Sequence, residues 1–117
     1  MREIKFRVWD KIDGKIREVT LIDFEYKKVK LLNDYTGESY LRDFEEVILL
    51  EYTGLKDKND KEIYEGDILI WENAYSVKPM TVESIDGSFV VEGYKPLGRN
   101  GLYIGAKIVG NIYEKDK

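Results

Sequence analysis

Apolar and polar residues alternate along most of this chain, which is the pattern of β-strands that bury one face. Near the N-terminus, Phe6 and Val8 fall on one side of a predicted strand. Lys5, Arg7 and Trp9 fall on the other side. Glycine, aspartate and asparagine recur between such segments and mark turns. The sequence therefore predicts an all-β fold of short antiparallel strands, either barrel-like or two-lobed, with little helix.

The predicted strands are bounded by these turn residues and cover residues 4–9, 15–22, 26–32, 47–50, 68–71, 80–85, 88–94 and 106–113. The runs at 47–50 and 68–71 are continuously apolar, so we expect them to be buried on both faces. The Asp-Gly pair at 86–87 predicts a tight hairpin turn, and residues 95–101 predict a loop. One helical turn is expected within residues 41–46, with Asp43 as its cap.

Composition excludes several classes of chemistry. The chain of 117 residues has neither cysteine nor histidine, which rules out a thiolate metal site, a zinc centre and a serine–histidine triad. No apolar run approaches the roughly 20 residues that span a bilayer, and the N-terminus lacks a signal-peptide core. We expect a cytoplasmic protein without a cofactor, folded as one domain (1–117) in which about 1–52 and 53–117 are candidate lobes.

Residues 53–67 are the most informative segment. The Lys-Asn-Asp-Lys sequence at 58–61 predicts a tight polar turn, because asparagine and aspartate tolerate the left-handed backbone region. Gly66 and Asp67 predict a bend before the apolar run at 68–71. Glycine permits a positive φ there, and the Asp67 carboxylate can accept backbone N–H bonds. The segment is therefore predicted to be a folding device.

The sequence of this segment is similar to the signature of the YopX family of bacteriophage and prophage proteins. It reads Thr-Gly-Leu-Lys-Asp-Lys-Asn and then Lys-Glu-Ile-Tyr-Glu-Gly-Asp. Residues 5–10 and 109–114 resemble that family's terminal strands, so the resemblance spans nearly the whole chain. Asp60 departs from the pattern, because glycine is common at that position. The residues identified with the family pattern are Thr53, Gly54, Asp57, Tyr64, Gly66, Asp67, Gly110 and Asn111.

The resemblance implies an all-β fold and a phage or prophage origin, and hence the cytosol of a bacterial host. It implies no reaction mechanism. The carboxylates of residues 57–67 are candidate cation ligands, but lysines interleave with them and no calcium-loop spacing is present. Carboxylate-based hydrolysis through Glu65 and Asp67 would need a defined separation between the two carboxylates, which the sequence does not set. We therefore predict that the protein is not an enzyme, with no catalytic and no metal-binding residues.

Charge is distributed unevenly, with a balance of +3 over residues 1–30, −8 over 31–72 and +1 over 73–117. A nucleic-acid-associated regulator that uses Lys5, Arg7 and Trp9 is one hypothesis, since rings beside basic residues suit single strands. The pI of about 5.0 argues against it. The favoured hypothesis is a protein-binding module with Lys5, Arg7 and Trp9 as a candidate interaction surface. Its partner is a host or phage protein or a second copy, and no membrane or small-molecule substrate is inferred.

Overall fold

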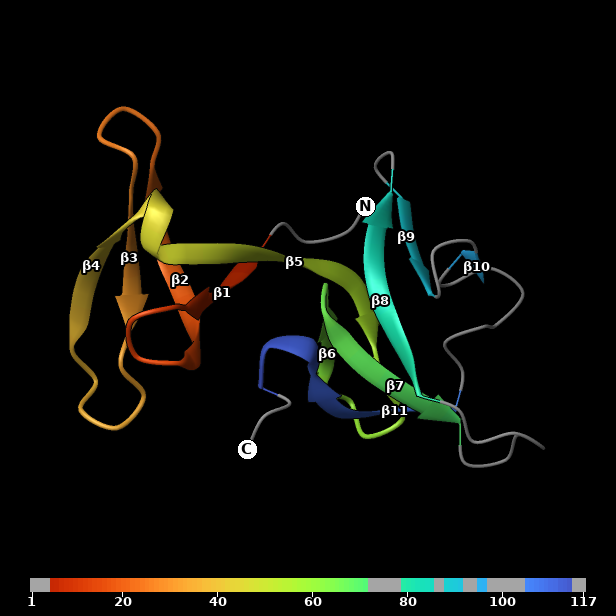
Figure 1. The fold of residues 1–117 in the computed structure, drawn as a ribbon. Helices are drawn as coiled ribbons and strands as arrows, with labels where there is room; N and C mark the ends of the chain where they lie inside the picture. The colour runs from red at the N-terminus through yellow and green to blue at the C-terminus, as the bar shows by residue number, and fades with distance from the viewer. Residues whose placement is uncertain (1–4, 72–78, 86–87, 92–94, 97–104, 115–117) are drawn as a thin grey trace. The chain divides into compact units, whose positions relative to one another are not determined.

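The structure, a computed structural model, describes residues 5–71, 79–85, 88–91, 95–96 and 105–114 (Figure 1). The described residues fall into two compact units. Residues 5–51 form the first, which we call the meander unit, and the second, which we call the C-terminal unit, begins at Tyr52. Strands in both units pair antiparallel, and the helical segments of the described ranges are two short 3-10 turns.

The meander unit consists of consecutive strands hydrogen-bonded in the order β4-β3-β2-β1-β5 (Figure 1, red to yellow). Its elements are β1 (Phe6–Asp10), β2 (Lys15–Asp23), β3 (Lys28–Leu32), β4 (Ser39–Asp43), the 3-10 turn η1 (Phe44–Glu46) and the first half of β5 (Val47–Lys56). Each of β1 to β4 follows its neighbour through a short polar turn, so local turn chemistry sets the register.

One face of this sheet forms the core of the meander unit, where Val8, Val29, Leu31 and Val47 are buried together. The opposite face, which we call the outer face, carries apolar side chains as well. Paired residues point to the same side of a sheet. Leu21 lies opposite Lys30, and Lys30 lies opposite Leu41, so these three side chains form a row across β2, β3 and β4 on the outer face.

The C-terminal unit contains the second half of β5, which pairs with β6, and a sheet in the order β10-β9-β8-β7-β11. Its elements are β6 (Glu62–Tyr64), β7 (Asp67–Trp71), β8 (Met80–Ile85), β9 (Ser88–Val91), β10 (Lys95–Pro96), β11 (Ala106–Asn111) and the 3-10 turn η3 (Ile112–Glu114). Its core is a cluster of buried aliphatic residues, Ile63, Leu69, Val82, Val91 and Ala106.

The predicted all-β antiparallel fold is confirmed, and the described strands form open sheets and not a closed barrel. The predicted hairpin is confirmed by the pairing of Ile85 with Ser88, although its turn residues lie outside the described ranges. The predicted loop at 95–101 is wrong at its start. Lys95 and Pro96 pair with β9 as a short edge strand, a position where proline is tolerated, and residues 97–101 lie outside the described ranges.

Two local expectations change at the junction of β4 and β5. The helical turn is confirmed as η1, but it is shorter than residues 41–46 because β4 extends to Asp43. The Asp43 N–H donates to the Glu46 carboxylate at 2.9 Å and caps the turn. Burial of the run at 47–50 on both faces is confirmed in part. Val47 and Leu50 point to opposite faces, because they pair with Asp10 and Arg7, and both are buried, whereas Leu49 is 36% exposed. In the run at 68–71, Leu69 is fully buried and its neighbours are partly buried.

We expect Leu31→Ala to lower the free energy of unfolding by about 3 kcal/mol, because it leaves a cavity in the core of the meander unit. Leu21→Ala is the matched control on the outer face and should cost about 1 kcal/mol or less. Urea unfolding followed by circular dichroism measures both. Equal losses would contradict the assignment of the two faces.

Candidate functional site

Thr53 and Gly54, the first residues of the signature segment, lie in the second half of β5. The Thr53 hydroxyl donates a hydrogen bond of 2.8 Å to the Ile63 carbonyl and accepts one of 3.1 Å from the Leu55 N–H. Gly54 has a φ of +87°, in the region that favours glycine. The register of β5 and β6 shifts across this stretch, so Thr53 bonds the two strands where the ladder is interrupted.

Asp57 organises the turn that follows. One carboxylate oxygen accepts the N–H groups of Asn59 at 2.8 Å and Lys61 at 2.9 Å, and the other accepts the Ile108 N–H at 3.0 Å. Burial alone would raise the pKa of Asp57, but the hydrogen bonds from Ile108, Lys61 and Asn59 outweigh it and lower the pKa. The carboxylate is therefore held ionised as a structural acceptor.

The same loop covers one edge of β11. The Lys58 N–H donates to the Ala106 carbonyl at 2.8 Å, beside the bond from Ile108 to Asp57. The opposite edge of β11 pairs with β7. The signature segment thus satisfies backbone groups that an open sheet edge would leave unpaired.

Asp67 and Asn111 form a second link between the signature segment and β11. The Asp67 carboxylate accepts the Tyr64 N–H at 2.8 Å and the Asn111 side-chain amide at 3.1 Å. The Asn111 carbonyl in turn accepts the Tyr113 N–H at 3.0 Å. A Cβ atom on Gly66, whose φ is +84°, would lie 3.2 Å from the Asn111 amide nitrogen. Both the backbone angle and the close approach of Asn111 therefore favour glycine at this position.

Three other signature positions differ in how well the structure explains them. Tyr64 is fully buried, with its ring 5.4 Å from that of Tyr52. Asp60 has a φ of +66°, which explains why glycine suits this position and why the Asn-Asp turn still forms. Gly110 follows the register shift of β11, but a Cβ there would meet nothing within 4 Å, so sterics do not explain the glycine.

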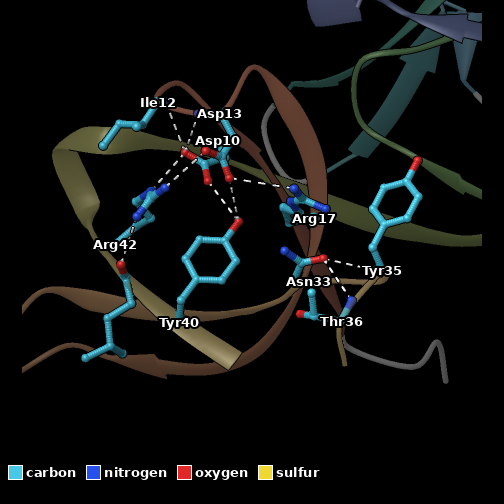
Figure 2. A network of polar contacts seen from close by, with 10 residues as sticks. Asp10, Ile12, Asp13, Arg17, Asn33, Tyr35, Thr36, Tyr40 and Arg42 are labelled. Carbon is cyan, nitrogen blue, oxygen red and sulfur yellow. Dashed lines mark hydrogen bonds and ion pairs between the residues drawn. The ribbon is translucent and has the colours of Figure 1, made fainter. Parts of the chain in front are cut away.

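A second polar cluster lies in the meander unit and was not identified from the sequence. Figure 2 shows the carboxylates of Asp10 and Asp13 pointing toward the side chains of Tyr40 and Arg42. Asp10, which is fully buried, accepts hydrogen bonds from the Tyr40 hydroxyl at 3.0 Å and the Arg42 Nε at 3.1 Å. Arg42 also forms an ion pair of 3.4 Å with Asp13, and it lies 4.7 Å above the Tyr40 ring.

The turn between β1 and β2 completes this cluster. The Ile12 N–H donates to Asp10 at 3.0 Å, and Arg17 forms an ion pair of 3.6 Å with Asp13. The buried Nε of Arg17 has no hydrogen-bond partner among the described residues. The sequence marked Asp10 only as a turn residue, because its partners on β4 are about thirty positions away and follow no local pattern.

Electrostatics in this cluster favour a fixed ion pair over proton transfer. Burial opposes the charge on Asp10, but the hydrogen bonds from Arg42, Tyr40 and the β1–β2 turn lower the pKa of its carboxyl. Burial, together with the bond to Asp10, raises the pKa of Tyr40 to about 12. Asp10 therefore stays ionised and Tyr40 stays protonated near neutral pH, an arrangement that joins β4 to the β1–β2 turn.

The candidate surface at Lys5, Arg7 and Trp9 lies in the meander unit. The signature residues belong to the C-terminal unit. All three side chains are half-buried, and Arg7 forms an ion pair of 3.4 Å with Glu18. Trp9 lies on the outer face, as the alternation predicted, because its neighbours Val8 and Asp10 are buried on the core side. The positive charge of Arg7 is thus partly neutralised within the sheet.

Exposed hydrophobic side chains gather in the meander unit. Among the described residues, the large exposed ones in this unit are Ile12, Leu21, Phe24, Tyr26, Tyr35, Leu41 and Leu49, whereas the C-terminal unit contributes Val109. Ile12, Phe24, Tyr26 and Tyr35 occupy the three turns that join β1 to β4, and Tyr35 is 88% exposed. Alternation could not find these residues, because it describes strands and not turns.

Among the described residues, no group of three or more aspartate or glutamate side chains is placed to hold a metal ion. In the segment 57–67, Asp57 and Asp67 accept backbone N–H groups, Glu62 accepts the Tyr64 hydroxyl at 3.2 Å, and Asp60 is exposed. No helix in the described part of the chain is long and apolar enough to cross a membrane.

The fold and its polar clusters define a small protein of two antiparallel β units. In the second unit, the buried carboxylates of Asp57 and Asp67 bond to β11. The YopX protein family model matches residues 5–117, and the chain belongs to the YopX family. Among solved structures, protein EF1440 from Enterococcus faecalis is similar, with a TM-score of 0.68 and 28% sequence identity over 97% of this chain and 96% of that one. A search of curated proteins found no match.

We expect Gly66→Val to be strongly destabilising, by about 3 kcal/mol, because it forces a branched side chain to a positive φ and against Asn111. Gly14 is the matched control, with a φ of +67° and nothing within 4 Å of an added Cβ. Gly14→Val should therefore cost less. Thermal melting compares the two, and an unchanged melting temperature for Gly66→Val would refute the structural role of the bend.

Asp10→Asn should cost about 3 kcal/mol at pH 7, because it leaves Arg42 without its buried counter-charge. The folded-state pKa of Asp10 is lowered from 3.8, so its ionisation stabilises the protein above that pH. This contribution is lost as the pH falls through the lower folded-state pKa. Urea unfolding from pH 7 to pH 3 measures the free energy of unfolding of both proteins. The difference between wild type and variant should narrow below about pH 4. A gap independent of pH would contradict the ion-pair assignment.

Proposed function

We propose that this YopX-family protein is a non-enzymatic protein-binding module, a phage or prophage accessory protein that acts in the cytosol of a bacterial host. The observation that carries the proposal is the concentration of exposed hydrophobic side chains on the meander unit. Exposed aromatic residues are enriched in protein interfaces, because their large apolar area is buried when a partner binds. Tyr26, Tyr35 and Phe24 are each more than two-thirds exposed on turns.

The polar clusters support binding over catalysis. Both carboxylate oxygens of Asp10, Asp57 and Asp67 accept hydrogen bonds from the protein's own groups. A general base needs a lone pair directed at substrate and a pKa near the working pH. The pKa values of Asp10 and Asp57 are lowered instead, which suits permanent structural anions. The rigid sheets then serve to present the turns.

The competing hypothesis, a nucleic-acid-associated regulator, has weaker support. Residues 5–51 hold nine lysine and arginine residues against eleven aspartate and glutamate residues, a balance of −2. Arg7 pairs with Glu18 and Lys28 pairs with Asp43, which reduces the positive charge available to phosphates. A mobility shift with single-stranded DNA at low salt would favour the regulator, and the absence of a shift would favour protein binding.

The test is affinity purification of the tagged chain from a lysate of the bacterial host, with native mass spectrometry of the complex. We expect a complex of fixed stoichiometry that the double variant Tyr26→Ser/Tyr35→Ser weakens at least tenfold, by removing two exposed aromatic rings. Glu25→Ser/Asp34→Ser is the matched control, since these exposed residues occupy the same two turns. A complex that responds equally to both variants would contradict the proposed surface. Finding neither a partner nor self-association would refute the function.

A further inference from the structure

Strand β4 is the last strand of its sheet, with β3 on one side and no other strand of the described ranges on the other. Hydrogen bonding in an antiparallel pair alternates, so every second residue directs its N–H and C=O away from the neighbouring strand. The bonds that flank the β3–β4 ladder fix the phase of this alternation. The Asn33 N–H donates to the Glu38 carbonyl at 2.8 Å, and the Phe44 N–H donates to the Lys27 carbonyl at 2.9 Å.

Hydrogen-bonded pairs recur at every second residue from these bonds. Tyr40 and Arg42 therefore form hydrogen-bonded pairs with β3. Leu41 between them therefore directs its N–H and C=O to the outer edge of β4. The partner of Leu41 agrees with this phase, because the Lys30 carbonyl faces β2 and accepts the Thr20 hydroxyl at 3.2 Å.

This edge is less protected than the edge of β11. There, Asp57 and Lys58 bond the outward backbone groups of Ile108 and Ala106. On β4, the Glu46 carboxylate occupies the Asp43 N–H at one end, and the Arg42 side chain makes a long contact of 3.4 Å with the Leu41 carbonyl. The Leu41 N–H has no comparable cover in the described structure.

The sequence of β4, Ser-Tyr-Leu-Arg-Asp, is complementary to itself when read in the antiparallel direction about Leu41. Leu41 then lies opposite its own copy, and Tyr40 lies opposite Arg42 of that copy. An arginine beside a tyrosine ring is favourable, and the chain already holds Arg42 4.7 Å from its own Tyr40. Ser39 lies opposite Asp43, so no like charges face each other in this register.

We propose that two copies of the chain pair antiparallel along β4, with a two-fold axis at Leu41. Their meander sheets then form one continuous sheet through backbone bonds between the two Leu41 residues. The exposed Leu41 side chains, 53% accessible in the single chain, meet on the outer face. The inference deepens the proposed function, because it identifies a second copy as one partner of the meander unit.

The first test uses the absence of cysteine from the chain. In the proposed dimer, the Cα atoms of the two Leu41 residues lie about 5.5 Å apart, within the range that a disulfide spans. Leu41→Cys should therefore form a disulfide-linked dimer under mild oxidation. Leu21→Cys is the control, because this leucine is similarly exposed on the same outer face but lies on an interior strand. Equal cross-linking of both variants would overturn the proposal.

The second test is sedimentation equilibrium of the full chain. Wild type should be a dimer at about 100 µM, where a micromolar interface is saturated. Leu41→Lys should be a monomer, because it places two like charges opposite each other, whereas Leu21→Lys should remain a dimer. Circular dichroism confirms that both variants fold. A monomeric wild type, or a dimer unaffected by Leu41→Lys, would overturn the proposal. A monomer that still captures a lysate protein through Tyr26 and Tyr35 refutes β4 pairing and leaves the proposed function intact.

Discussion

Two buried carboxylates hold the C-terminal unit together by accepting hydrogen bonds from backbone and amide groups far away in the sequence. Asp57 bonds to Ile108, 51 residues later, and Asp67 bonds to Asn111, 44 residues later. Each burial is tolerable only because several donors replace the lost water. Strand β11 is thus paired with β7 on one edge and covered by the signature segment on the other. The YopX signature segment encodes this closure of the C-terminal unit.

In the meander unit, segments distant in the sequence are linked by bonds between side chains. Asp10 is buried against Arg42 and Tyr40, so a charge-assisted bond and an aromatic ring connect the β1–β2 turn to the edge strand β4. A network of this kind fixes one arrangement of the strands, because removing any member leaves another group unsatisfied. Rigidity of β4 matters for recognition, since a strand that is already ordered loses little conformational entropy when a partner pairs with it.

The strands and turns were predictable because alternation and turn chemistry are local. The Asn-Asp turn, the Gly66–Asp67 bend and the η1 cap all followed from neighbouring residues. The cluster around Asp10 was not predictable, because it joins residues about thirty positions apart that each have an ordinary local role. Strand β10 was missed because proline and glycine dominate its surroundings. Trp9 lies in the same unit as the most exposed hydrophobic side chains, but those side chains lie in turns, where strand periodicity carries no information.

The two units differ in how much of their sheet edges and hydrophobic side chains is covered by the chain itself. In the described part of the C-terminal unit, the edge of β11 is covered by backbone bonds and Val109 is its one large exposed hydrophobic residue. In the meander unit, an edge strand keeps an outward N–H at Leu41, and aromatic rings stand exposed on two successive turns. Both features carry a cost for an isolated monomer, since bare edges and apolar patches promote association. Their presence on a unit whose core is well packed is the physical reason to look for partners there.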